Sequence, residues 1–252
     1  MSDIIPIIEK KYFLAEKIDC TPEVLAIRFR PEDGQLQVFD PGMFMMISGI
    51  DKKTGQKCVG RAFSIASDPS APNMEFFVIK EPTHGEHLGR SHFMDAEIGD
   101  PFILKGPNGQ FRFNPGTEKK VMFIAGGTGL APFVSMAKHI KLKNAGTDAI
   151  LLYSVKFPTE IIFKDQLEEL SAQIGMKFVV TVTRPNQSAP NEGSAWSGET
   201  GHVDSGMISR HCSDILERTF YICGPLAFVQ AVKQALASLN VPGNRVKADV
   251  WG

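Results

Sequence analysis

The chain has 252 residues and a formal net charge of −1, with 27 Lys and Arg residues against 28 Asp and Glu residues. Its 43% hydrophobic and 22% charged content is typical of a globular protein, which excludes wholesale disorder. The balanced charge gives no global field that would attract nucleic acid or an anionic membrane surface, and no apolar run approaches the roughly 18 to 20 residues of a membrane helix. We therefore expect a cytoplasmic protein with no nucleic-acid or membrane partner.

The cysteines are too scattered for a metal site. None forms a C-x-x-C pair or a cluster with His, as a structural zinc or a Cys-ligated iron–sulfur centre would require. We expect free thiols and no metal at all four positions, which are Cys20, Cys58, Cys212 and Cys223.

The first part of the chain predicts a compact antiparallel β-barrel or sandwich. Short β-rich runs are separated by turn signals such as Pro31-Glu32-Asp33-Gly34 and Pro107-Asn108-Gly109. A helix-like insertion at 87–94 interrupts the pattern. The predicted strands lie near 24–29, 43–50, 62–66, 74–79 and 102–104.

The pattern changes near residue 116, after which apolar runs alternate with helical spacing. Runs that are apolar at nearly every position are typical of strands buried on both faces of a parallel sheet. We expect such strands at 121–125, 149–153, 178–182 and 220–223, a last strand near 245–250 and a surface loop at 185–201. The prediction is a two-domain chain, with a β-barrel domain at 1–116 and an open α/β domain at 117–252.

A glycine-rich turn provides the strongest local signal. Gly126-Gly127-Thr128-Gly129 follows a predicted strand directly and precedes an amphipathic helix that has Pro132 in its first turn. Glycines let the backbone approach a diphosphate, and the free N–H groups at a helix start can bind it. A structural turn without a ligand is the alternative, but the strand–turn–helix context favours the nucleotide site.

A second motif, Arg61-Ala62-Phe63-Ser64, lies in the β-rich part. Alternation along a strand places Arg61 and Phe63 on one face and Ala62 and Ser64 on the other. An arginine can pair with a diphosphate, an aromatic ring can pack against a flavin, and a hydroxyl can hydrogen-bond a flavin nitrogen. On their own, these residues are more typical of an ordinary strand with a surface charge, a core ring and a small filler.

A third motif, Tyr221-Ile222-Cys223-Gly224-Pro225, again ends a predicted strand and begins a helix. Ligands of open α/β sheets bind beyond the carboxyl ends of the strands, so this motif and the glycine-rich turn point to one crevice. A free cysteine is most often a small buried hydrophobe, but the position of Cys223 favours contact with a cofactor ring.

In this order, and across this change of pattern, the three motifs resemble the ferredoxin–NADP reductase superfamily of flavoproteins over nearly the whole chain. The resemblance implies an FAD-binding barrel followed by an NADP- or NAD-binding α/β domain. It implies that Arg61 contacts the flavin diphosphate, with Ala62 beside it, that Phe63 contacts the isoalloxazine face and that Ser64 contacts its N5 edge. Phe63 replaces the more usual tyrosine and lacks its hydroxyl.

The resemblance extends to two further turns of the barrel. Gly85-Glu86-His87-Leu88 is similar to the family's second diphosphate turn, which implies that His87, Leu88 and Gly89 lie near the flavin diphosphate. The hydroxyl expected in that turn is absent from its place. Gly106-Pro107-Asn108-Gly109-Gln110-Phe111 is similar to the turn that closes the barrel, and its implied role is structural.

On the nicotinamide side, the resemblance implies that Gly126, Gly127, Thr128 and Gly129 bind the diphosphate, with Cys223, Gly224 and Pro225 beside the nicotinamide. Asp249-Val250-Trp251 resembles an ending in which an acidic residue precedes an aromatic ring that covers the flavin until the nicotinamide displaces it. Packing of Trp251 into an ordinary groove is the alternative. The implied catalytic residues are Ser64, Cys223, Asp249 and Trp251.

The choice between NADPH and NADH rests on three residues. Lys156 and Arg184 follow the second and third predicted strands and could receive a 2′-phosphate, while the strand end at Tyr153-Ser154-Val155 offers no carboxylate for a free ribose. Glu199 lies in a segment similar to that of NADH-using members. The sequence therefore favours NADPH slightly.

These observations favour a stand-alone NAD(P)H:acceptor reductase that passes electrons to a separate redox protein, such as ferredoxin, flavodoxin or a cytochrome. A fused iron–sulfur domain is not expected, because the chain lacks clustered cysteines. A free-flavin reductase, an electron-transfer subunit or flavin-binding module of a larger complex, and a nucleotide-free protein with purely structural glycine turns remain alternatives. The oligomeric state is left open.

Overall fold

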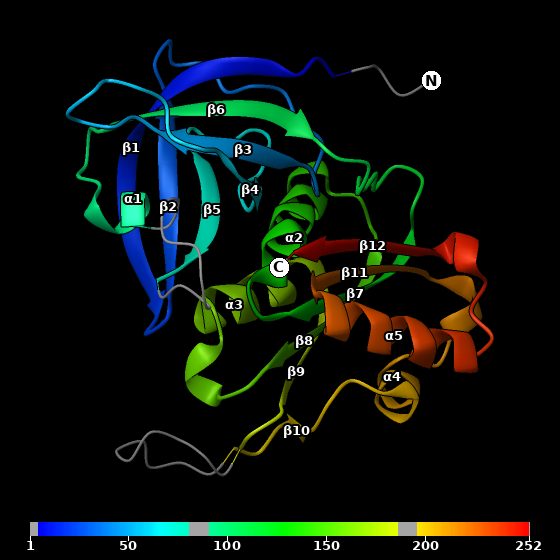
Figure 1. Ribbon diagram of the computed structural model, residues 1–252. Coiled ribbons are helices and arrows are strands. Elements are labelled where there is room, and N and C mark those ends of the chain that lie inside the picture. Colours follow the sequence, from blue (N-terminus) through cyan, green and yellow to red (C-terminus); the bar gives the residue numbers. More distant parts are fainter. Residues whose placement is uncertain (1–4, 81–90, 186–195, 252) are drawn as a thin grey trace.

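Two six-stranded sheets organise the chain, one antiparallel and one parallel (Figure 1). The computed structural model describes residues 5–80, 91–185 and 196–251. The antiparallel sheet ends at Asn108 and the parallel sheet begins at Lys120. This arrangement confirms the predicted fold class. The domain boundary predicted at residue 116 falls in the connection between the two sheets and stays a prediction.

The antiparallel sheet has the strand order β4-β3-β6-β1-β2-β5 and curls into a nearly closed barrel, because its edge strands β4 and β5 approach each other. Aromatic rings fill its interior, with Phe29 packed on Phe76 and Phe102. The elements are β1 (Ile8–Thr21), β2 (Val24–Pro31), β3 (Phe44–Gly49), β4 (Arg61–Ser64), β5 (Met74–Ile79), α1 (Ser91–Asp95) and β6 (Pro101–Asn108). The long strand β1 is an element that the sequence did not predict.

The parallel sheet has the order β10-β9-β8-β7-β11-β12, so that β7 and β11 are neighbours although they are far apart in sequence. The strand order reverses between these two strands, and open sheets bind ligands at such a point. The strands are β7 (Lys120–Gly126), β8 (Asp148–Val155), β9 (Lys177–Val182), β10 (Glu199–Thr200), β11 (Thr219–Pro225) and β12 (Val246–Trp251). The short strand β10 lies in the segment predicted as a loop.

Helices cover both faces of the parallel sheet (Figure 1). The buried side chains of α2 (Ala131–Lys143) and α3 (Lys164–Ile174) belong to the cluster that also contains Phe77 and Phe111 of the barrel part. Those of α4 (Ser205–His211) and α5 (Leu226–Ser238) pack on the opposite face. The sheet is thus sandwiched between two helical layers, and one of these layers also contacts the barrel.

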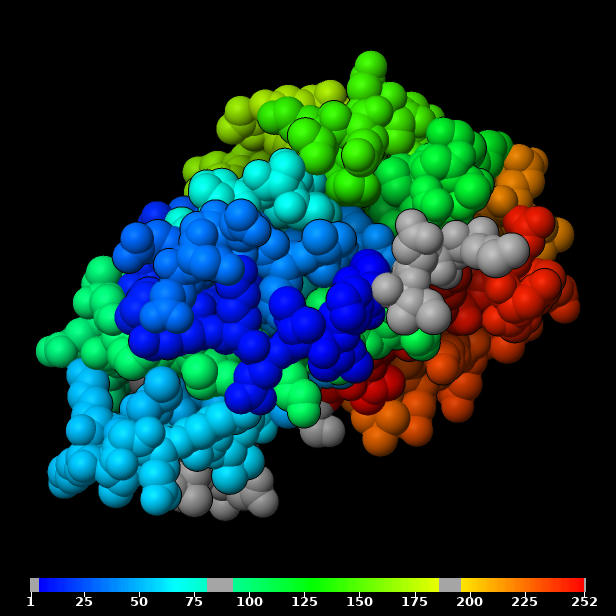
Figure 2. Space-filling model, turned by 90° about the horizontal axis from the view of Figure 1, so that it is seen from above, coloured from blue at the N-terminus to red at the C-terminus, as the bar shows by residue number. Residues whose placement is uncertain are grey.

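The two parts of the molecule pack side by side, as the space-filling view shows (Figure 2). Aromatic side chains from the connection between the sheets fill the junction. Phe111 lies 6.0 Å from Phe133 and 5.3 Å from Tyr221, measured between ring centroids. Phe113 lies 5.7 Å from Phe123 in the same way. This shared core gives the barrel and the parallel sheet a fixed relation to each other.

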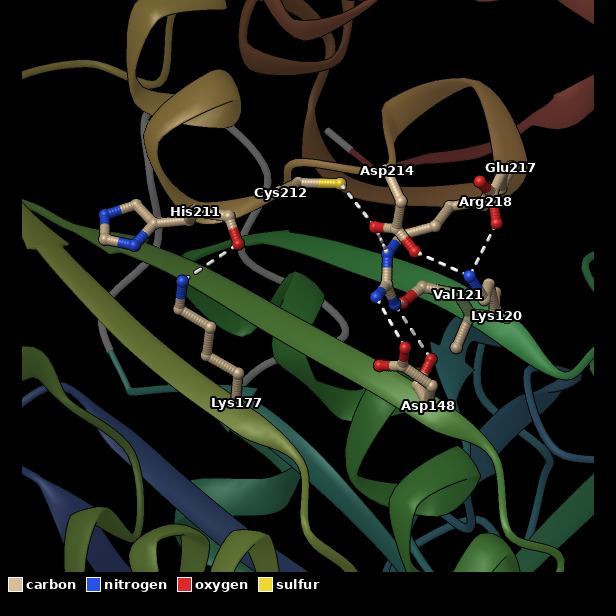
Figure 3. A network of polar contacts seen from close by, with 9 residues as sticks. All are labelled: Lys120, Val121, Asp148, Lys177, His211, Cys212, Asp214, Glu217 and Arg218. Atoms are coloured by element: carbon tan, nitrogen blue, oxygen red, sulfur yellow. Dashed lines mark hydrogen bonds and ion pairs between the residues drawn. The ribbon is translucent and has the colours of Figure 1, made fainter.

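A polar network closes the amino-terminal edge of the parallel sheet (Figure 3). Arg218 is its centre, and its guanidinium donates to the carboxylates of Asp214 at 2.6 Å and Asp148 at 2.7 Å. It also donates to the carbonyl oxygens of Val121 at 3.2 Å and Asp148 at 2.9 Å. Lys120 adds a second cation that contacts Asp214 at 3.0 Å. The network ties together the starts of β7, β8 and β11, at the edge opposite to the strand ends discussed below.

Within the described ranges, no helix is both long enough and apolar enough to cross a membrane.

Candidate functional site

The glycine-rich turn connects β7 to α2. Gly126 is the last residue of β7, Gly127–Leu130 form the short 3-10 turn η1, and α2 begins at Ala131. Gly127 has a φ of +55°, a left-handed conformation that glycine adopts without strain. Among the described residues, no side chain caps the start of η1 or of α2. The N–H groups at these two starts are therefore not occupied by a capping side chain, which suits a phosphate-binding turn.

The carboxyl end of β11 lies so close to this turn that only glycine fits. A Cβ atom on Gly129 would lie 2.3 Å from the carbonyl oxygen of Cys223 and 2.8 Å from the Cα of Gly224. A Cβ on Gly224 would lie 3.3 Å from the Cα and N of Gly126. The structure thus brings the two glycine-containing motifs together at the point where the strand order reverses.

Phe228, in the first turn of α5, covers the place where the two strand ends meet. A Cβ atom on Gly126 would lie 2.9 Å from its ring, and one on Gly224 would lie 2.8 Å from it. Sequence reasoning missed this residue because it lies outside the helical spacing that starts at Leu226 and Val229, although its ring packs against the sheet. Its spacing of four residues after Gly224, one helical turn on, is the signal that could have indicated it.

Strand β12 carries the carboxyl-terminal residues to the same place. It pairs in parallel with β11, so that Asp249 lies beside Cys223 and Trp251 beside Pro225. A Cβ atom on Gly127 would lie 3.9 Å from Cζ2 of Trp251. The indole nitrogen of Trp251 is buried, and no described residue accepts a hydrogen bond from it. The end of β12 thus reaches the glycine-rich turn between the barrel and the sheet (Figure 1).

Burial controls the charges of Cys223 and Asp249. Cys223 is 1% exposed, and this burial, reinforced by the nearby Asp249 carboxylate, raises the pKa of its thiol well above the usual value. Burial also raises the pKa of Asp249. At neutral pH Cys223 is therefore an uncharged thiol, which can contact a flat apolar ring without the cost of burying a charge.

On the barrel side, Ser64 ends β4 and lies opposite Phe44 of β3, while Arg61 lies opposite Ile47. Ala62 is exposed. The ring of Phe63 contacts Phe93 edge-on at a centroid distance of 5.2 Å and joins the barrel core. The sequence did not predict this aromatic partner, and contact of Phe63 with a flavin stays a prediction. The residues predicted near the flavin diphosphate, His87, Leu88 and Gly89, lie outside the described residues.

Two side chains of α2 fix the glycine-rich turn relative to the segment that follows Ser64. Ser135, in the second turn of α2, donates a hydrogen bond to the carbonyl oxygen of Ser67 at 2.6 Å. Lys138, one turn further on, donates to the carboxylate of Glu75 at 2.9 Å and to the carbonyl oxygen of Ala66 at 3.2 Å. The helix that begins at the turn is thus bonded directly to the barrel, close to the Arg61–Ser64 strand.

A cavity of about 300 Å³ opens at the junction between the barrel and β12. Phe44, the strand partner of Ser64, and Asp249, the strand partner of Cys223, both line it. The turn after β6 forms another wall, so it contributes to this cavity in addition to closing the barrel. The complete lining is Phe44, Gly109, Gln110, Phe111, Lys247, Ala248 and Asp249.

Two exposed cations, Lys156 and Arg184, meet at the carboxyl ends of β8 and β9. The backbone N–H of Arg184 donates to the carbonyl oxygen of Lys156 at 2.8 Å. The guanidinium of Arg184 lies over the ring of Phe157, 5.9 Å from its centroid. The Glu160 carboxylate turns back and accepts from the Lys156 N–H at 2.9 Å. Sequence reasoning missed this carboxylate because it follows the strand end by several residues.

The carboxylate of Glu199 is bound to two residues of helix α4. Its carboxylate accepts hydrogen bonds from Arg210 at 2.9 Å and contacts His211 at 2.8 Å, both on α4. These contacts lower the pKa of Glu199. The acidic residue that favoured NADH in the sequence is therefore paired with Arg210 of α4.

Comparison with known proteins places this geometry among reductases. Residues 123–234 match the family described as the oxidoreductase NAD-binding domain. The chain is 28% identical over 219 residues to the glycine betaine monooxygenase reductase subunit of Chromohalobacter salexigens, an alignment that covers 86% of this chain and 57% of that protein. The chain thus spans about three fifths of the length of the curated relatives that it matches.

Two solved structures share the fold over almost their whole length. The flavohem-like FAD/NAD-binding domain of nitric oxide dioxygenase from Vibrio cholerae O1 biovar El Tor superposes with a TM-score of 0.81 and 21% identity, covering 96% of this chain and 98% of that one. The cytochrome b5 reductase domain of Ulva prolifera nitrate reductase superposes with a TM-score of 0.80 and 25% identity, covering 96% and 97%.

Proposed function

We propose that this chain is an NAD(P)H-dependent, FAD-containing reductase of the ferredoxin–NADP reductase superfamily and that it passes electrons to a separate redox protein. Ferredoxin, flavodoxin, a cytochrome and an oxygenase component are the candidate acceptors. The observation that carries the proposal is the meeting of the glycine-rich turn, the end of β11 and the end of β12, together with the bonds from α2 to the barrel segment that follows Ser64.

The residues at this place fit a dinucleotide and a flavin. Glycine at 126, 129 and 224 lets the turn, the end of β11 and the ring of Phe228 pack in direct contact. No described side chain caps the N–H groups at the starts of η1 and α2, so that these groups could bind a diphosphate. The buried indole N–H of Trp251 lacks an acceptor among the described residues, and a bound cofactor would supply one. Both observations support ligands that bind beside the glycine-rich turn and Trp251.

Each of the predicted catalytic residues then has a defined task. Bound FAD supplies the exchange between the two-electron hydride of a nicotinamide and the one-electron steps of a redox-protein acceptor. We propose that Ser64 donates a hydrogen bond at the flavin N5 edge, that the neutral Cys223 thiol packs against the nicotinamide, and that Trp251 covers the flavin ring until the nicotinamide arrives. Asp249 lies beside Cys223, where its carboxylate would repel a second anion. Because burial raises its pKa, Asp249 also holds a proton more readily than an exposed carboxylate does.

Ser64→Ala tests the hydrogen bond at the barrel side. We expect FAD to remain bound, because a hydroxyl contributes little to the packing of β4, and the rate of flavin reduction by NADPH to fall about tenfold, the effect of losing roughly 1.4 kcal/mol. Stopped-flow absorbance under anaerobic conditions measures the rate. Ser70→Ala, in an exposed turn of the barrel, is the control. An unchanged rate in Ser64→Ala would remove Ser64 from the reaction.

We further propose that NADPH is the preferred nucleotide. Lys156 and Arg184 present two cations where a 2′-phosphate would lie, and a guanidinium binds phosphate through paired hydrogen bonds. Glu199, the carboxylate that would disfavour the phosphate, is bound to α4. Glu160 is directed at the backbone of Lys156.

Arg184→Leu tests this preference. We expect the KM for NADPH to rise about tenfold, because a charge-assisted hydrogen bond to the phosphate is lost, while the KM for NADH stays within about twofold of the original value. Lys143→Leu removes an exposed cation at the far end of α2 and should change neither constant. Equal effects of Arg184→Leu on both nucleotides would contradict the proposed phosphate contact.

One observation supports the alternative that this chain is an electron-transfer subunit of a larger complex. The relatives include a protein named as the reductase subunit of a monooxygenase, which acts as part of a larger system. In that case the acceptor is an oxygenase partner. Steady-state assays with ferredoxin, flavodoxin and cytochrome c as acceptors distinguish the cases, because a subunit dedicated to one partner reduces all three slowly although its flavin is reduced rapidly.

A further inference from the structure

A partly buried polar cluster links the connection between the two sheets to the last strand. Its members are Glu118 of the connection, Tyr221 of β11 and Lys247 of β12, and we call it the β12 anchor. The Tyr221 hydroxyl donates to the Glu118 carboxylate at 2.7 Å. The Lys247 ammonium donates to Glu118 at 2.7 Å and to the Tyr221 oxygen at 2.6 Å. It also lies over the Tyr221 ring, 4.7 Å from the centroid.

The side chains of the β12 anchor have no task in the proposed electron transfer, yet they are held more firmly than a surface ion pair. Tyr221 is fully buried, and its hydroxyl also lies 2.9 Å from the carbonyl oxygen of Arg112. The second carboxylate oxygen of Glu118 accepts from the backbone N–H of Asn114 at 3.0 Å. The connection and β11 thus form a fixed base to which Lys247 attaches β12.

Strand β12 needs such an attachment because it is the edge of the sheet. Among the described strands it pairs only with β11. Residues at alternate positions of a strand share a face, so Lys247, Asp249 and Trp251 point to the same side. Asp249 and Trp251 lie roughly 7 and 13 Å beyond Lys247 along the strand. Fixing Lys247 therefore fixes the direction in which the other two side chains approach the glycine-rich turn.

We propose that Lys247, held by Glu118 and Tyr221, is a positioning residue that sets where Asp249 and Trp251 lie against the glycine-rich turn. The consequence for nicotinamide binding rests on the proposed function, but the positioning itself does not. Without the Lys247 cation, the bond between Tyr221 and Glu118 remains, so that the junction core persists, while β12 keeps its pairing with β11 but loses its side-chain attachment to the connection. The effect is thus confined to the end of β12.

The two tryptophans of the chain, Trp196 and Trp251, allow a direct measurement. In a Trp196→Phe background, Trp251 is the single tryptophan, and its emission maximum and its quenching by acrylamide report how it is covered. We expect Lys247→Met to shift the emission to longer wavelength and to increase quenching. The KM for the nicotinamide should change about threefold or more, which is the size of effect expected when a residue influences binding by positioning other residues.

Two further variants separate positioning from general destabilisation. Lys120→Met is the matched control, because the Lys120 side chain is 41% exposed against 38% for Lys247, and it pairs with Glu217 at 2.6 Å at the start of the interior strand β7. It should leave the Trp251 signals unchanged. Lys247→Arg retains a cation that can reach Glu118 and should restore both signals.

The outcomes are distinct from those of the electron-transfer proposal. Unchanged Trp251 emission and quenching in Lys247→Met overturn the positioning role, even where flavin reduction is normal. If the parent protein shows no flavin reduction at all, the fluorescence of the variants still decides the question. If Lys247→Met does not fold, Glu118→Gln replaces it, because the amide keeps a partner for Tyr221 and weakens the hold on Lys247. No change of fluorescence in that variant would likewise overturn the proposal.

Discussion

Gly129→Ala should reduce the rate of flavin reduction by NADPH on the order of 100-fold, the loss that follows when reacting groups are displaced by about 1 Å. The added methyl group would lie 2.3 Å from the carbonyl oxygen and 2.6 Å from the carbonyl carbon of Cys223. These are backbone atoms of a central strand, so they cannot move aside as a flexible side chain can. The turn η1 must therefore move away from β11, and with it the N–H groups that would hold the diphosphate.

The FAD content of Gly129→Ala should stay close to that of the original protein, because the barrel side of the site is unchanged. Stopped-flow reduction and a binding titration with NADP⁺ measure the effect. Gly243→Ala is a suitable control, because its Cβ atom would meet nothing within 4 Å and its backbone conformation is accessible to alanine. A rate for Gly129→Ala within about twofold of the original would show that the glycine-rich turn does not bind the nucleotide.

Arg218→Met should lower the free energy of unfolding by about 3 kcal/mol and Tm by roughly 6 to 12 °C. The Arg218 side chain is 6% exposed, and it holds two carboxylates and two carbonyl oxygens at the start of the parallel sheet (Figure 3). Methionine fills the space but removes the hydrogen bonds that Arg218 donates to these four acceptors, while Lys120 still contacts Asp214. Arg210→Met is the control, because Arg210 is 56% exposed and its pair with Glu199 is worth at most about 1 kcal/mol.

The same network predicts how stability depends on pH. Burial alone would raise the pKa of Asp214, but hydrogen bonds from Arg218 and Lys120 outweigh it and lower the pKa from 3.8 to about 2. A carboxyl group with a lowered pKa stabilises the fold fully above its unfolded value, and this contribution is lost as pH falls from about 4 to 2. Thermal unfolding across this range should show a smaller loss for Arg218→Met than for the original protein. Equal losses would contradict the account.

The parallel sheet could be predicted from the sequence because its strands are buried on both faces. Strand β7 was expected at 121–125 and found at Lys120–Gly126, and β11 was expected at 220–223 and found at Thr219–Pro225. Strand β1 could not be predicted in this way. Its 14 residues include charged side chains on the outer face and two irregularities of register, which interrupt the alternation of apolar and polar residues.

The candidate site was predictable only where its residues are adjacent in sequence. The glycine-rich turn and the Cys223-Gly224-Pro225 segment were recognised from spacing, and the structure brings them together. The bonds of Ser135 to Ser67 and of Lys138 to Glu75 join residues more than sixty positions apart, so no local pattern indicates them. The same holds for Phe228, whose ring faces a glycine of another strand, and for the β12 anchor.

The most direct test of the account is the anaerobic absorption spectrum of the purified protein before and after addition of NADPH and of NADH. We predict a flavin spectrum that NADPH bleaches rapidly and NADH more slowly, because we propose that the chain binds both FAD and the nicotinamide at the junction between the barrel and the parallel sheet. A flavin band that neither nucleotide bleaches, or a protein that retains no flavin, would contradict the central claim that this junction is the site of hydride transfer.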